Sequence, residues 1–403
     1  MARPIYSPWL NRFAVFTAFI TLILIGVGGL VTSKGAGMAV PDWPTSYGYN
    51  MFALPFKFWR GGAFHEHTHR LVASMVGLLT AILALWLWAR ETERKVRRNG
   101  IVAITVILLI VGGMMGVRKN PVFISIALAG LCGIVFGLFK IKQTSGVRWF
   151  GIVALSAVVL QGVLGGLRVV LFKDEIGIFH ATLAQLFLVL VSIIALLTSQ
   201  WWQGFQTSIE IMPGRTLRRF AIATTALILI QLILGATMRH QHAGLAVPDF
   251  PFSYGKIWPS LDSASIQLIN QQRLDANDPN PITAFHIVVH LFHRLTAFLI
   301  LGLIVGLALN FRKKLGSRSI ISRLSMFWLG MITAQVGMGI LTVLKNKPAD
   351  IATGHVMLGA ASLVMGALIV MITRKISVER EIPVRHVETA ISVRPCSESK
   401  KVC

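Results

Sequence analysis

Four histidines occupy matching positions in the two halves of the sequence. His69 and His180 lie in the first half, and His293 and His355 lie in the second. Each falls within about two helical turns of one end of an apolar stretch. An imidazole inside a membrane is costly without a partner, so such histidines bond to one another, carry protons or bind a metal. Two histidines at equal depth on different helices also suit the axial positions of a haem iron, so the pattern favours a haem site in each half.

Each half also carries an arginine directly after its first histidine. These residues are Arg70 and Arg294. The planar guanidinium group can bind carboxylates such as haem propionates through two parallel hydrogen bonds. The simpler interpretation is an interfacial arginine that extends its charge towards water.

Glu66 breaks the symmetry between the halves. It lies three residues before His69 on the same helix face, whereas the equivalent position in the second half is His290. A carboxylate beside a haem site is a candidate proton acceptor or electrostatic group, and the alternative is a solvated glutamate near a helix start. Spacing leaves open whether the neighbouring histidines are ligands, relay members or rim residues: His65, His67, His286 and His290. His240 and His242 fall in a predicted loop.

The composition identifies the class of protein that holds these residues. The chain has 403 residues, of which 54% are hydrophobic and 14% charged, whereas soluble domains carry about 25% charged residues. Apolar runs of membrane-spanning length predict an all-α polytopic membrane protein with about ten spans. These are residues 13–32, 64–89, 101–117, 121–139, 149–170, 176–198, 218–238, 284–309, 322–343 and 352–372. We expect contact with membrane lipid and no binding of nucleic acid, because lysines and arginines that flank membrane spans explain the net charge of +23.

The distribution of these basic residues predicts the orientation of the chain. Alternate connectors, counted from the N-terminus, hold most of the 39 lysines and arginines. The positive-inside rule therefore places both termini in the cytoplasm and the four histidines towards the outer leaflet. Residues 101–139 form either a full hairpin or a shallower re-entrant one.

An internal repeat defines two halves. Residues 37–48 return as residues 244–255, with nine of twelve positions identical. Each half has four matching spans, which predicts two parallel-repeat four-helix bundles. The expected boundaries are 1–200 for the first half with its inserted hairpin at 101–140, 201–375 for the second half, and 376–403 for a cytoplasmic tail.

At these residues the sequence resembles the haem A synthase family. The resemblance is carried by Glu66-x-x-His69-Arg70, by His180 after Gln161-Gly-Val-Leu-Gly-Gly, by His293-Arg294, by His355 after a glycine-rich span and by the loop around residues 35–44. It covers residues 13–372 apart from 101–139.

The resemblance implies a membrane oxidoreductase that converts haem O into haem A by oxidising a ring methyl group to a formyl group. It implies that His293 and His355, with Arg294, hold a resident haem b. It also implies that His69 and His180, with Arg70, flank the substrate haem and that Glu66 is catalytic. Many bacterial members carry a cysteine pair in the first loop, and residues 33–63 contain no cysteine, so no thiol-dependent step is expected there.

Two other functions fit parts of the pattern. A non-enzymatic cytochrome b with two haems explains the four histidines but not the difference between Glu66 and His290. A parallel-repeat transporter with a histidine proton relay predicts ionisable residues near the bilayer midplane, whereas these histidines lie towards one side. For the synthase, the expected partners are a haem O synthase upstream, an unidentified electron donor or acceptor and, as a further option, a second copy of the chain.

Overall fold

The computed structural model is built almost entirely of helices. It describes residues 7–115, 120–144, 146–171, 173–204, 214–272 and 281–381. Within these ranges ten helices are long and apolar enough to cross a membrane, and the only β-pairing is two isolated bridges. The predicted class, an all-α polytopic membrane protein, is confirmed.

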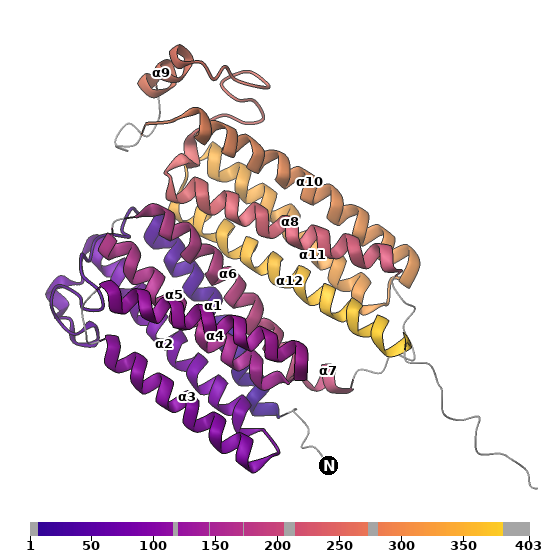
Figure 1. Cartoon of the computed structure of the whole chain (residues 1–403). Helices are drawn as coiled ribbons and strands as arrows, with labels where there is room; N and C mark the ends of the chain where they lie inside the picture. The colour runs from indigo at the N-terminus through magenta and orange to yellow at the C-terminus, as the bar shows by residue number, and fades with distance from the viewer. Residues whose placement is uncertain are drawn as a thin grey trace, which may run out of the picture.

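Two groups of four helices each bury a hydrophobic core (Figure 1). The first core is formed by α1 (Pro8–Ser33), α2 (Gly61–Ala89), α5 (Val147–Leu171) and α6 (Asp174–Leu197). The second core is formed by α8 (Arg215–His240), α10 (Ala284–Leu315), α11 (Ile320–Leu344) and α12 (Ala349–Glu381). The outward faces keep large apolar side chains exposed, as lipid contact requires.

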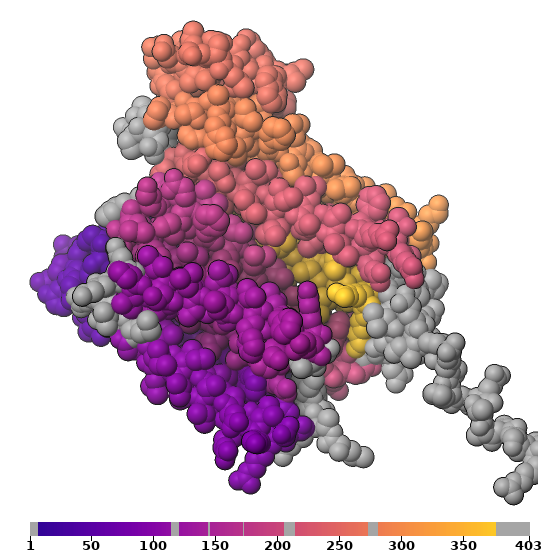
Figure 2. Space-filling view, in the orientation of Figure 1, coloured from indigo at the N-terminus to yellow at the C-terminus, as the bar shows by residue number. Residues whose placement is uncertain are grey.

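The two groups meet along α1 and α6 on one side and α8 and α12 on the other. Small residues allow α1 and α12 to approach closely. A Cβ at Gly26 would lie 2.5 Å from Met357 Sδ, and one at Gly29 would lie 3.2 Å from Thr353 Cγ2. The space-filling view shows the two groups packed against each other, with α12 (yellow) visible between them (Figure 2).

The inserted segment forms a hairpin of two full-length helices, α3 (Arg94–Met115) and α4 (Asn120–Thr144). Of the two predicted forms, helix length favours the spanning hairpin over the re-entrant one. Glycines let α4 lie close along α5, because a Cβ at Gly133 would be 2.3 Å from Ser156 Oγ.

The long connections 34–60 and 241–283 leave the same end of the bundle, which we call the loop end. Their described residues, which leave out 273–280, contain three short 3-10 helices and one α-helix: η1 (Met51–Ala53), η2 (Phe56–Phe58), η4 (Ala243–Leu245) and α9 (Ser263–Gln272). The short helix α7 (Gln200–Gly204) follows α6 at the opposite end (Figure 1). The predicted tail begins inside α12, and its residues from 382 onwards lie outside the described part of the chain.

Candidate functional site

The first histidine pair joins α2 and α6 near the loop end. The ring centroids of His69 and His180 are 6.5 Å apart, and their planes are inclined at 77°. A metal-bound imidazole nitrogen lies about 2 Å from its metal, so two rings on opposite sides of one metal ion have centroids about 6 Å apart. The observed spacing therefore fits a single metal ion held between the rings.

The second pair, on α10 and α12, repeats this arrangement. The ring centroids of His293 and His355 are 6.4 Å apart, with an angle of 65° between the planes. Both rings line a cavity of about 230 Å³ whose walls are mostly apolar and whose loop end carries Arg239 and Arg294. An apolar slot with two imidazoles and cations at one edge fits an apolar macrocycle that carries carboxylates.

Backbone carbonyls of the neighbouring helices orient one histidine of each pair. His180 Nδ1 lies 3.2 Å from the carbonyl oxygen of Gln161, and His355 Nδ1 lies 3.1 Å from that of Gln335. A proton on Nδ1 donated to the carbonyl leaves Nε2 as the metal ligand, which is the usual support of a ligating histidine. Gln161 also donates its side-chain amide to the carbonyl oxygen of His180 at 2.8 Å, which ties α5 to α6.

A glycine on an adjacent helix faces each of the four rings. A Cβ on the glycine would lie 2.9 to 3.2 Å from the ring's Cε1 atom in every case. The pairs are Gly28 with His69, Gly165 with His180, Gly235 with His293 and Gly339 with His355. A larger residue would push the imidazole out of position, so these glycines belong to the site.

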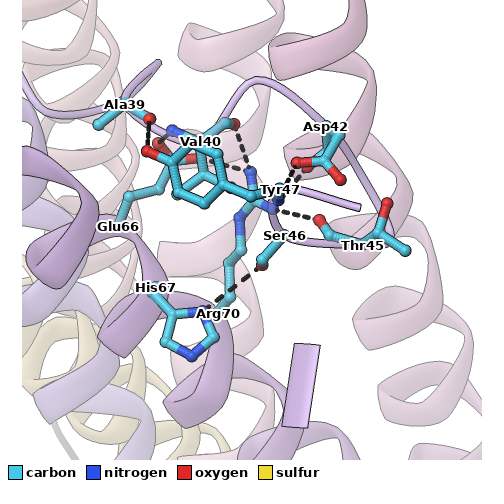
Figure 3. A network of polar contacts seen from close by, with 9 residues as sticks. All are labelled: Ala39, Val40, Asp42, Thr45, Ser46, Tyr47, Glu66, His67 and Arg70. Carbon is cyan, nitrogen blue, oxygen red and sulfur yellow. Dashed lines mark hydrogen bonds and ion pairs between the residues drawn. The ribbon is translucent and has the colours of Figure 1, made fainter. Parts of the chain in front are cut away.

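Glu66 belongs to a polar network that fastens the first loop to α2 (Figure 3). The residue is 4% exposed. Its Oε2 accepts a hydrogen bond from the Val40 amide at 2.8 Å, and its Oε1 lies 2.6 Å from Arg70 Nη2. This is not the solvated helix-start glutamate of the alternative interpretation. The catalytic role of Glu66 stays a prediction.

The guanidinium of Arg70 is committed to the same loop. Besides Glu66 it donates to the carbonyl oxygens of Val40, Asp42 and Thr45 at 2.7 to 2.9 Å. Propionate binding by Arg70 stays a prediction, but the contacts present are those of a brace that holds the loop.

The second loop has the same backbone turn as the first but is held to its helix by different contacts. Arg294 donates to the carbonyl oxygens of Val247 and Phe252 at 2.8 and 3.1 Å. His290, in the position of Glu66, is 2% exposed and hydrogen-bonds to the backbone of Ala243. Both positions therefore hold a loop to a helix, with a carboxylate in one half and an imidazole in the other.

An aspartate shapes the turn of each loop. Asp42 accepts from the amides of Tyr47 and Gly48, and Asp249 makes the same two bonds to Tyr254 and Gly255. Partial burial raises the pKa of the Asp42 carboxyl group, but these bonds together with one from Thr45 outweigh it and lower the pKa below the ordinary value.

The remaining histidines of the rim have local partners. His65 lies 3.1 Å from Lys34 Nζ, His67 packs edge-on against Trp59 at 4.7 Å, and His286 takes part in the capping box that begins α10. The prediction that His240 lies in a loop was wrong, since His240 is the last residue of α8 and only 5% exposed.

Sequence reasoning also passed over Arg168 and Arg239, which lie inside α5 and α8. Arg239 reaches across to α1, where it donates to the carbonyl oxygen of Gly29 and, at 2.6 Å, to Ser33 Oγ. The sequence does offer a signal for them. Arg168 follows Gly165 by three positions and Arg239 follows Gly235 by four, so each places a charge near the end of an apolar span.

A family model described as a cytochrome oxidase assembly protein (COX15-CtaA) matches residues 11–119 and 122–369. The match includes most of the inserted hairpin, so the similarity extends further than the motifs alone indicate.

Three relatives named haem A synthase match over much of their length. The one from Halalkalibacterium halodurans is 23% identical over 90% of this chain and 96% of its own length. The one from Bartonella quintana is 22% identical over 83% of this chain and 84% of its own. The one from Alkalihalophilus pseudofirmus is 25% identical over 62% of this chain and 67% of its own.

Proposed function

Because the chain belongs to the COX15-CtaA family of cytochrome oxidase assembly proteins, we propose that it is a haem A synthase, a membrane enzyme that oxidises haem O to haem A. The observation that carries the proposal is the pair of histidine sites, in which ring centroids 6.5 and 6.4 Å apart leave room for one iron in each half. Relatives that carry this name and match over most of the chain support it.

The two sites have different roles. His69 and His180 would hold the substrate haem O, and His293 and His355, which line the cavity beside Arg294, would hold a resident haem b. The fit rests on the Nδ1 hydrogen bonds, which leave Nε2 free for iron, and on the glycines that face the rings. When bound, haem b supplies one-electron redox chemistry beside the substrate site.

The reaction converts a methyl group on the haem O ring into an aldehyde. Two successive hydroxylations give first a hydroxymethyl group and then a gem-diol, which loses water to leave the formyl group. Each hydroxylation removes two electrons from the methyl carbon, so an external oxidant must take up four electrons in all. Glu66 is the residue that receives a proton or stabilises positive charge at the methyl carbon. Its carboxylate is held in place by Arg70 and by the Val40 amide, so it needs little reorganisation during the reaction.

The cellular arrangement follows from the charge distribution and from the substrate. The enzyme is a multi-pass protein of the inner cell membrane with both termini in the cytoplasm and the histidine pairs towards the outer leaflet. A haem O synthase is the partner that supplies the apolar substrate. An electron donor or acceptor completes the redox balance.

Co-expression with a haem O synthase in a host that lacks haem A tests the proposal. Membrane haems are extracted, separated by liquid chromatography and identified by mass. Haem A or its hydroxymethyl precursor is expected, and it should disappear in the His180→Ala variant. A folded, haem-loaded protein that yields only haem B and unconverted haem O would contradict the enzyme and favour a two-haem electron carrier.

A further inference from the structure

The two halves differ in side chains at the loop end of their helices. When the glycines opposite the ligand histidines are aligned, three basic residues stand opposite hydroxyl side chains of the other half. The pairs are Arg168 with Thr342, Arg239 with Thr32 and His240 with Ser33. These three basic groups therefore have no basic equivalent in the other half.

Two of these residues, one from each half, meet at Gly177 of α6. A Cβ at Gly177 would lie 2.6 Å from His240 Nδ1 and 3.1 Å from Arg168 Nε. The terminal nitrogens of Arg168 lie against the first loop, because a Cβ at Gly37 would be 3.1 Å from its Nη2. Arg168 therefore extends from the border between the halves to the start of the repeated loop motif.

These basic groups are incompletely paired. Arg168 Nε and His240 Nδ1 are buried without a hydrogen-bond partner among the described residues, and His240 is only 5% exposed. Two carboxylates are near Arg168: Asp174 Oδ1 is 3.9 Å from Nη2, beyond hydrogen-bond distance, and Glu66 interacts at longer range while bonded to Arg70. A buried cation without a hydrogen-bonded anion is costly, so the cluster suits an anionic ligand.

The cluster lies beside the first histidine pair. Gly177 is three residues before His180, which puts it on the same face of α6, one turn closer to the loop end. Arg168 is likewise three residues beyond Gly165, the glycine that faces the His180 ring. Arg168 interacts electrostatically with both His69 and His180. A macrocycle ligated by these histidines would reach the cluster at its edge, where haem carries its carboxylates.

We propose that Arg168 and His240 form a binding site for a propionate carboxylate of the haem held between His69 and His180. The assignment rests on the proposed function of that pair as a substrate site. Because His240 comes from α8, the second half completes the substrate site of the first. Arg168 and His240 add a carboxylate contact beside Arg70, whose guanidinium already has four acceptors.

Binding of a free acid and of its ester distinguishes this site. The full-length protein with the His355→Ala substitution, which removes a ligand of the second site, is titrated with haemin and with haemin dimethyl ester, and binding is followed by the Soret band. We expect this protein to bind haemin about tenfold more tightly than the ester, because the ester cannot form the charged hydrogen bond. Adding Arg168→Gln should remove the preference, and adding His240→Ala should reduce it.

Arg323→Gln, an exposed arginine on α11, is the matched control and should keep the preference. Equal affinity of the Arg168-containing protein for haemin and ester would overturn the proposal without relying on the folding of any Arg168 variant. A folded Arg168→Gln protein that still prefers the acid tenfold would overturn it as well. No binding of either form would contradict the haem site itself, and the proposal with it, whereas binding without preference would contradict only the carboxylate site.

Discussion

At the scale of single residues, the site combines reactive groups with residues that only hold them. His180 illustrates both kinds of support, because the Gln161 carbonyl orients its ring and Gly165 leaves room for it. The histidines themselves could be selected from the sequence, since a repeated imidazole inside apolar spans is unusual. Their supports could not, because a glycine or a backbone carbonyl becomes part of a site only when two helices pack at a given rotation.

The charge of Glu66 is predicted to be essential to the oxidation. Glu66→Gln keeps an oxygen for the Val40 amide but loses the ion pair with Arg70. Haem A formation should fall by roughly 100-fold or more if the carboxylate acts on a proton, while haem bound to the second half stays at the level of the parent protein. The exposed Glu175→Gln on α6 is the control, and chromatography of extracted haems is the measurement. Normal haem A formation by Glu66→Gln would mean that Glu66 only holds the loop and takes no part in the oxidation.

Gly165 is predicted to set the position of the His180 ring. Gly165→Val should weaken haem binding at the first site by about tenfold, because the new side chain presses on Cε1 of the imidazole. Gly162→Val on the same helix, where a Cβ meets nothing within 4 Å, should bind haem normally. Equal Soret titrations for the two variants would show that ring position does not depend on this contact.

At the scale of helices and loops, each half fastens its loop differently although the loop motifs nearly coincide. In the first half, Trp43 packs against Phe123 of the inserted hairpin, with ring centroids 4.8 Å apart. In the second, the equivalent Phe250 stacks on Phe298 of α10 at 6.4 Å. The inserted hairpin thus supports the first loop, which Glu66 and Arg70 fasten to α2.

Removal of this support is predicted to affect one half only. Phe123→Ala should lower haem occupancy of the first site, because a buried aromatic side chain lost from a core costs about 3–5 kcal/mol. Phe139→Ala, at a position that is 55% exposed on the same helix, serves as the control and should change little. The haem-to-protein ratio of purified protein provides the readout. A uniform loss at both sites would indicate general unfolding instead.

The ten spans were predictable because long apolar runs identify membrane helices almost by themselves. The C-terminal end of α8 was not predictable in this way. His240 is still helical, although the polar residues around it suggested a loop. That residue becomes buried where α8 packs against α6 at Gly177, which lies far away in the sequence. Periodicity and composition carry no information on such contacts.

At the scale of the whole molecule, the two halves form one unit because α1 packs on both. Gly28 faces His69 within its own half, while the next residue, Gly29, meets Thr353 of α12 and accepts a hydrogen bond from Arg239 at its carbonyl. One turn of α1 therefore contacts both halves.

A larger side chain where α1 packs against α12 is predicted to destabilise the whole protein. Gly29→Leu should lower the free energy of unfolding by about 1–3 kcal/mol through overpacking against Thr353. Gly302→Leu on α10, where a Cβ meets nothing within 4 Å, should be neutral or stabilising because leucine favours helix more than glycine does. The melting temperatures of the two variants, measured by thermal unfolding in detergent, test this prediction. Equal melting temperatures would mean that stability does not depend on the close approach of α1 to α12 at Gly29.

The shared contacts of α1 also constrain how the duplicated halves can diverge. After a duplication, each copy is normally free to accumulate changes while the other preserves the ancestral role. Here Gly28 contacts His69 of the first half while Gly29 contacts Thr353 and Arg239 of the second, and His240 of the second half lies near His180 of the first. A chimera that joins the first half of one relative to the second half of another should therefore fail unless the residues on both sides of this border are exchanged together.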